Sequence, residues 1–221
     1  MSLRAVIFDF DGLILDTEKA EFDSWQEVYQ EHGVELDFND WAVCIGTSGA
    51  FDPVGHLMKL TGLALDRDAV RAQQDEKNRR YLAGMTLFPG VIDRLDEAAA
   101  SGLGVGLASS ASDGWVVGNL RRHGILERFH AIRTRTQVLR AKPAPDLFLA
   151  TAEALCVSPS ESVVLEDSLN GVKAAKAAGM FCVAVPNGLT SRMDLSGADL
   201  RVSGLASFTL AEVGRLMEAK G

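Results

Sequence analysis

The sequence predicts an α/β protein: a Rossmann-like, doubly wound parallel sheet with an inserted α-helical cap domain. Short apolar runs alternate with helical patterns from residue 86 to the end of the 221-residue chain, which implies a mainly parallel sheet with helices on both faces. No strand pattern occurs between residues 16 and 84, directly after the first strand. We therefore expect residues 1–14 and 86–221 to form the core and residues 15–85 to form the cap domain.

The first strand is expected at residues 3–8, where the apolar run is continuous, as in strands buried on both faces. Asp9 and Asp11 follow, and their side chains leave an extended chain on the same side. Two carboxylates held so close repel each other, so a folded protein needs a cation or a shared proton there. Gly12 then supplies the backbone freedom for a turn.

The inserted segment has helical periodicity. From Thr17 onward, apolar residues recur three and four positions apart until Gly33. Thr17 and the acidic residues after it suit a helix start, because the helix dipole favours negative charge in the first turn. Further helices are expected at residues 38–44, 54–60 and 68–81, with a break at residues 45–49.

The remaining chain alternates between buried strands and helices. The expected strands are residues 103–108, 129–132, 163–165, 181–185 and 200–202, and the expected helices are residues 91–99, 116–124, 144–155, 171–178 and 210–219. Ser109, Glu166 and Asp167 directly follow strands. Ligands of open parallel sheets bind at the carboxyl ends of the strands, so we expect the site at this edge, beneath the cap.

The charge, the apolar runs and the cysteines of the chain exclude several classes of function. The formal net charge of -8 argues against nucleic acid as a partner. No apolar run is long enough to span a bilayer, and a core strand begins too early for a signal peptide, so we expect a cytoplasmic protein without a membrane partner. Cys44, Cys156 and Cys182 lack metal-site spacing and predict buried thiols in a reducing compartment. We expect a monomer, although the sequence carries no signal of oligomeric state.

Four clusters resemble the motifs of the haloacid dehalogenase superfamily, in the right order and over nearly the whole chain. The first is the string Phe-Asp-Phe-Asp-Gly-Leu-Ile-Leu-Asp-Thr-Glu at residues 8–18, which is similar to the branch of β-phosphoglucomutases and small-molecule phosphatases. Ser109, Lys142 with its flanking prolines, and the acidic pair Glu166-Asp167 resemble the other three. Four motifs at successive strand ends are a much stronger signal than any one of them.

The resemblance implies a role for each motif residue. Asp9 would be the nucleophile that forms an aspartyl-phosphate, and Asp11 would protonate the leaving oxygen and later take a proton from water. Ser109 would hold phosphoryl oxygens, and the ammonium of Lys142 would neutralise the transferring group.

The same resemblance implies a Mg²⁺ site of oxygen ligands. Its expected ligands are Asp9, the backbone carbonyl of Asp11, Glu166 and Asp167.

Three departures from the resemblance favour water over a second phosphate as acceptor. Aligned on Asp16, Thr17 and Trp25, the cap histidine of β-phosphoglucomutases falls on Glu21, and Gly49 stands where their cap arginine is expected. Their lysine and asparagine after the second motif fall on Ser112 and Asp113. A second phosphate beside Glu21 and Asp113 would be repelled. We therefore expect a Mg²⁺-dependent phosphatase, with a mutase as the alternative.

Two other functions stay open. A phosphonate hydrolase would need a cap lysine for a Schiff base, and Lys19 and Lys59 are candidates by residue type only. A non-catalytic binding protein could keep the fold, although the complete motif set argues against it.

The substrate is expected to be a small phosphate ester such as a sugar or polyol phosphate, because a helical cap closes over small molecules. The expected substrate-binding residues are Gly12, Glu21, Trp25, Thr47, Ser48 and Ser110.

Overall fold

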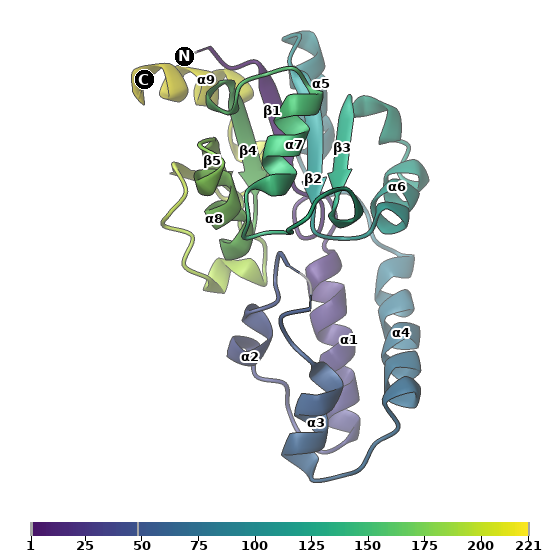
Figure 1. Ribbon diagram of the computed structural model, residues 1–221. Coiled ribbons are helices and arrows are strands. Elements are labelled where there is room, and N and C mark those ends of the chain that lie inside the picture. The colour runs from purple at the N-terminus through teal and green to yellow at the C-terminus, as the bar shows by residue number, and fades with distance from the viewer. Residues whose placement is uncertain (1, 48, 221) are drawn as a thin grey trace.

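The computed structural model describes residues 2–47 and 49–220. Within them, the six strands form one fully parallel sheet in the order β3-β2-β1-β4-β5-β6 (Figure 1). The strands are β1 Ala5–Phe8, β2 Gly104–Ser109, β3 Ala131–Thr134, β4 Ser162–Glu166, β5 Phe181–Ala184 and β6 Leu200–Arg201. The expected fold class is therefore confirmed. β1 lies in the middle of the sheet, so the residues that follow it lie between those that follow β2 and β4.

Helices cover both faces of the sheet, since alternate residues of each strand point to opposite sides. Phe8 of β1 belongs to the cluster that α5, α6 and α9 cover, whereas its neighbour Ile7 belongs to the cluster that α7 and α8 cover. The bounds are α5 Val91–Ala100, α6 Asp113–Arg122, α7 Asp146–Ala154, α8 Leu169–Ala177 and α9 Leu210–Lys220. All four residues of β1 are buried, which explains its continuous apolar run.

The inserted segment is helical and lies beyond the carboxyl ends of the strands (Figure 1). Its helices are α1 Thr17–Glu31, α2 Phe38–Ala42, α3 Pro53–Thr61 and α4 Arg67–Ala83. They bury a hydrophobic cluster, joined from outside the segment by Leu189, in which Trp25, Tyr29 and Leu57 are almost fully covered. A separate hydrophobic core is what an independent unit needs. We propose that residues 15–85 act as a cap domain on a core of residues 1–14 and 86–221.

The loop after α2 docks on the core. Asn170 Nδ2 donates to the carbonyl of Ile45 at 2.9 Å, and Thr47 Oγ1 donates to the carbonyl of Lys142 at 2.6 Å. Between them, Gly46 has a φ of +75°, and a Cβ at this position would lie 2.1 Å from Ser168 Oγ. Only glycine fits this conformation and this close approach.

Some element boundaries differ from the expected ones because of local capping. α8 begins two residues early, at Leu169, because the Ser168 side chain accepts a hydrogen bond from the Gly171 N–H and caps the helix. β3 begins at Ala131 and not at residue 129, because a short 3₁₀ turn over Leu126–Arg128 precedes it.

The cysteines are free thiols, but not all are buried as expected. Cys182 is buried in β5 and Cys44 is half-buried. Cys156 is exposed, because it lies in the turn after α7, with a φ of +56°. Among the described residues, no helix combines the length and the apolar character that a membrane span requires.

Candidate active site

A cavity of about 790 Å³ lies between the carboxyl ends of the strands and the helical segment. From the core it is lined by Asp9, Asp11, Ser109 and Ser110, among others. From the helical segment it is lined by Glu18, Glu21, Trp25 and Thr47, among others. The topology thus brings strand-end residues and residues of α1 to one space, as the sequence predicted.

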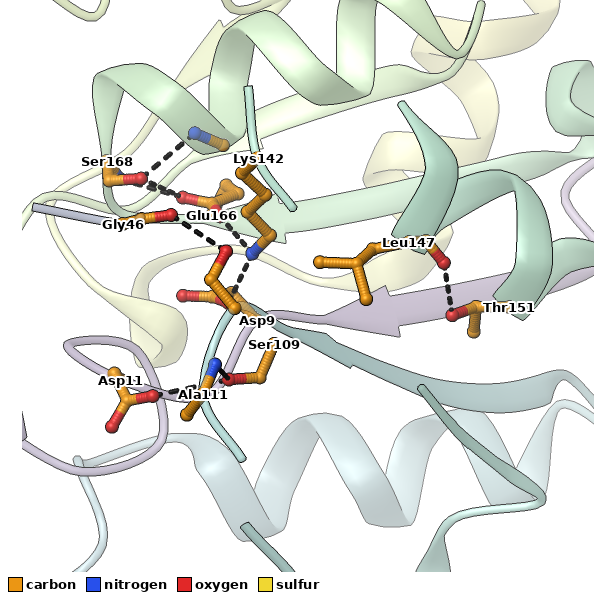
Figure 2. A network of polar contacts seen from close by, with 12 residues as sticks. Asp9, Asp11, Gly46, Ser109, Ala111, Lys142, Leu147, Thr151, Glu166 and Ser168 are labelled. Carbon is orange, nitrogen blue, oxygen red and sulfur yellow. Dashed lines mark hydrogen bonds and ion pairs between the residues drawn. The ribbon is translucent and has the colours of Figure 1, made fainter. Parts of the chain in front are cut away.

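Asp9 follows β1 directly and contacts Lys142, which lies on the loop before α7. The Lys142 ammonium makes a short ion pair with Asp9 Oδ1 and a second one, of 2.6 Å, with Glu166 Oε1 (Figure 2). Asp9, Lys142 and Glu166 are 3%, 1% and 0% exposed. The lysine is also held over the ring of Phe148 in α7, 4.9 Å from its centroid.

Burial raises the pKa of Asp9 and lowers that of Lys142, but the neighbouring charges leave both pKa values above their usual range. Burial, followed by the charge of Glu166, raises the pKa of Asp9, and Lys142 opposes this rise. Burial disfavours the Lys142 ammonium, but Asp9 and Glu166 outweigh it and raise the pKa of Lys142 above its usual value. The lysine is therefore a permanent positive charge beside the Asp9 carboxylate.

Asp9, Glu166 and Asp167 form a buried acidic cluster in which one carboxylate oxygen of each residue lies within 4.8 Å of the other two. Asp167 Oδ1 is buried and has no hydrogen-bond partner in the described part of the chain, whereas its Oδ2 accepts from Asn187 Nδ2 at 2.8 Å. Burial and the charges of Glu166 and Asp9 raise the pKa of Asp167 well above its usual value. An unpaired buried carboxylate oxygen is costly, and a divalent cation bound to oxygen ligands would remove that cost.

Both carboxylate oxygens of Glu166 accept hydrogen bonds from other groups of the protein. Oε1 accepts from Lys142, and Oε2 accepts from the backbone N–H of Ser168 at 2.8 Å and from its hydroxyl at 3.0 Å. The sequence pattern predicts Glu166 as a metal ligand. Glu166 is also the second carboxylate, after Asp9, that holds the Lys142 ammonium in place.

The Asp11 carboxylate lies outside the acidic cluster. Its Oδ1 accepts from Thr17 Oγ1 at 2.7 Å and from Trp115 Nε1 at 2.8 Å. Its Oδ2 accepts from Ser109 Oγ at 3.3 Å, a long hydrogen bond (Figure 2). Burial raises the pKa of Asp11, and the hydrogen bond from Trp115 opposes this rise most strongly. The Asp11 carboxylate is thus engaged by three protein donors, and its backbone carbonyl stays the predicted metal ligand.

The two serines after β2 have different partners. Ser109, the last residue of β2, is 1% exposed, and its Oγ accepts from the backbone N–H of Ala111 at 3.0 Å. Ser110 Oγ instead donates to the carbonyl of Gly46 at 3.1 Å, which joins the core to the docked loop. Both serines line the cavity.

On the cap side, Glu21 is held by two side chains. Its Oε1 accepts from Trp25 Nε1 at 3.1 Å, and its Oε2 accepts from Asn78 Nδ2 at 2.6 Å. Among the described residues, Asn78 Oδ1 and Trp41 Nε1 are buried without hydrogen-bond partners, and both residues line the cavity. The helical segment therefore holds one unpaired acceptor and one unpaired donor in residues of the cavity wall. Nothing in the sequence pattern singled out Trp41 or Asn78.

Gly12 does not lie where we expected. Its φ of +84° makes the predicted turn, but it lines a second cavity of about 630 Å³ and not the first one. Its N–H donates to the carbonyl of Leu15 within the turn at 2.7 Å, and its carbonyl accepts from the distant Asn187 Nδ2 at 2.9 Å, so both backbone groups are already hydrogen-bonded within the protein. Ser48, another expected substrate-binding residue, lies outside the described residues.

The haloacid dehalogenase-like hydrolase family profile matches residues 6–185, which include every motif named above. The chain belongs to this family. "Putative phosphatase YhcW" of Bacillus subtilis is 40% identical over 209 residues, 95% of each chain. β-Phosphoglucomutase of the same organism is 32% identical over 220 residues, 94% of this chain and 92% of the relative.

The fold comparison agrees with the sequence comparison. The crystal structure of CbbY from Rhodobacter sphaeroides in complex with phosphate matches this haloacid dehalogenase-like hydrolase with a TM-score of 0.72. The two chains are 27% identical, and the match covers 92% of this chain and 95% of that one. The expected family is thus confirmed, both from the family profile and from the structure.

Proposed function

We propose that this haloacid dehalogenase-like hydrolase is a Mg²⁺-dependent phosphatase that cleaves small phosphate monoesters through an aspartyl-phosphate on Asp9. One observation supports the proposal above all: Asp9 lines the cavity, is held by the buried Lys142, and belongs to the acidic cluster. A carboxylate held in place beside positive charge suits attack on a phosphoryl group.

The reaction divides into two displacements. A carboxylate oxygen of Asp9 attacks phosphorus, the bond to the ester oxygen breaks, and Asp11 gives that oxygen a proton. Asp11 then takes a proton from water, which attacks the aspartyl-phosphate and releases inorganic phosphate and the free Asp9 carboxylate. Lys142 and Ser109 would stabilise the phosphoryl oxygens in both steps.

The acidic cluster fits Mg²⁺. Asp9 and Asp167 would hold the ion together with the backbone carbonyl of Asp11, and Glu166 would support the site through Lys142. When bound, the ion would offset negative charge on the cluster and on the phosphoryl group. The support is the buried and unpartnered Oδ1 of Asp167 within an all-oxygen set of ligands.

We expect phosphate release to require Mg²⁺. A panel of sugar, polyol and other small phosphates would be assayed for phosphate release with added Mg²⁺ and after EDTA treatment. EDTA should abolish release, and Mg²⁺ should restore it. The midpoint of thermal unfolding should rise with Mg²⁺ in the wild type but not in Asp167→Asn, because a ligand that binds only the native state stabilises it. Release that survives EDTA would contradict the metal site.

A sugar or polyol phosphate is the proposed substrate class. The free donor Trp41 Nε1 and the free acceptor Asn78 Oδ1 are buried in the wall of the cavity, where a leaving group with hydroxyls could satisfy both. Buried polar groups without partners discriminate strongly against ligands that cannot pair with them. Glu21 lies beside Asn78 and would accept a further hydroxyl.

Removal of either unpaired group should selectively weaken the binding of substrates that carry hydroxyl groups. For Trp41→Phe and Asn78→Ala, we expect KM to rise about 3- to 10-fold, as the loss of one hydrogen bond implies. KM for an aryl phosphate should change less, since it has no hydroxyl to pair. Tyr81→Phe is the matched control: Tyr81 lies on α4 near Asn78 but bonds Glu27. Equal changes for both substrates would argue against this subsite.

The mutase remains the second candidate, and two observations favour it. One relative is a β-phosphoglucomutase, and Arg71 and Arg135 also line the cavity. Against it, Glu21, Gly49 and Ser112, which stand where the mutases are expected to bind a second phosphate, line the same cavity. The phosphate-release assay decides: conversion of β-glucose 1-phosphate to glucose 6-phosphate without release would favour the mutase.

A further inference from the structure

Trp115 contacts Asp11 although no motif contains it. Its indole N–H donates to Asp11 Oδ1 at 2.8 Å across 104 residues of sequence. It lies in the first turn of α6, is half-buried against the core cluster and lines the cavity. The next residue, Val116, and Leu120, one turn further along, are fully buried, so α6 presents the indole from a fixed position.

The two carboxylate oxygens of Asp11 accept hydrogen bonds that differ in number and length. Oδ1 receives two good hydrogen bonds, from Trp115 and from Thr17, whereas Oδ2 receives from the described residues only the long one of Ser109. A carboxylate oxygen with two donors has both lone pairs engaged. Oδ2 therefore has the capacity left to exchange a proton with a reacting group at the cavity.

The two donors to Oδ1 come from different parts of the chain. Thr17 begins α1 in the helical segment, whereas Trp115 belongs to α6 in the core. Asp9 and Lys142 also belong to the core, so the Trp115 bond fixes Asp11 relative to them whatever the position of the helical segment.

We propose that Trp115 is a positioning residue for proton transfer: its indole N–H holds Asp11 by Oδ1 and thereby aims Oδ2 at the leaving-group oxygen. The inference rests on the proposed phosphatase function. Geometry of this kind governs how well a general acid works, and a general acid contributes about 10²- to 10⁴-fold to a rate. A general acid that is present but no longer aimed at the leaving-group oxygen should contribute less to the rate.

The test compares two leaving groups in one variant. An alkyl alcohol needs a proton to depart, whereas p-nitrophenolate does not. For Trp115→Phe, we expect kcat/KM for the best sugar or polyol phosphate to fall about 10-fold and that for p-nitrophenyl phosphate to fall less than about 2-fold. The ratio of the two does not depend on the folded fraction. Trp115→Leu should give the same selective loss, because it too lacks the N–H.

Asn119→Ala is the matched control on α6. Its side chain bonds the backbone carbonyl of Trp115 but not Asp11, so both kcat/KM values should stay unchanged. Equal losses for both substrates in Trp115→Phe, or no loss for either, would overturn the inference and leave the phosphatase intact. If the wild type released phosphate from none of the esters, both the proposed function and this inference would be wrong.

Discussion

Asp9→Asn is expected to lower phosphate release from every substrate by at least about 10³-fold, the scale of loss when a covalent nucleophile is removed. The amide has nearly the size of the carboxylate but no anionic oxygen to attack phosphorus. Lys142 keeps its ion pair with Glu166 in this variant, so the site should stay folded. The loss should appear in kcat with native circular dichroism and an ordinary thermal transition.

Asp93→Asn is the control for this substitution. Asp93 is an exposed residue of α5, away from the cavity, and its variant should release phosphate at the wild-type rate. Single-turnover mixing followed by acid quench and mass spectrometry should detect a phosphorylated wild-type chain and an unmodified Asp9→Asn chain. If Asp9→Asn kept a tenth of the wild-type activity, the aspartyl-phosphate pathway would be untenable.

Lys142→Met is expected to damage both activity and stability. The substitution leaves Asp9 and Glu166 as two buried carboxylates without their shared cation. Removing one partner of a buried ion pair costs about 3–5 kcal/mol in the free energy of unfolding. Loss of a preorganised charge at the transferring group should lower kcat by about 10²- to 10³-fold. Urea unfolding and phosphate release would measure the two effects.

The double variant Lys142→Met/Glu166→Gln separates these effects. It removes the lysine and one of its two carboxylate partners, so part of the lost stability should return, because fewer buried charges are left unpaired. Activity should not return, since no cation replaces the lysine. Lys59→Met, which alters an exposed lysine of α3, should change neither quantity. A Lys142→Met enzyme with wild-type kcat would refute the assigned role.

The fold could be predicted from the sequence because burial leaves a direct trace in the residue pattern, and the family because four motifs resemble those of the haloacid dehalogenase superfamily. β1 lies inside the sheet with its residues fully covered, and its continuous apolar run predicted this. The polar residues that end β1, β2 and β4 predicted a shared edge, because the carboxyl ends of neighbouring parallel strands meet there. The cavity does lie at that edge, although the chemical role of each residue there stays a prediction.

Only the tertiary structure decided which other side chains complete the site. Trp115, Trp41 and Asn78 reach the cavity from α6, α2 and α4 by the packing of those helices, and no spacing in the sequence relates them to Asp9. The structure likewise decided that the backbone groups of Gly12 bond Leu15 and the distant Asn187, and that Gly12 lines another cavity. Local pattern records whether a residue is buried, whereas the partner of a buried polar atom is set by contacts between segments far apart in the chain.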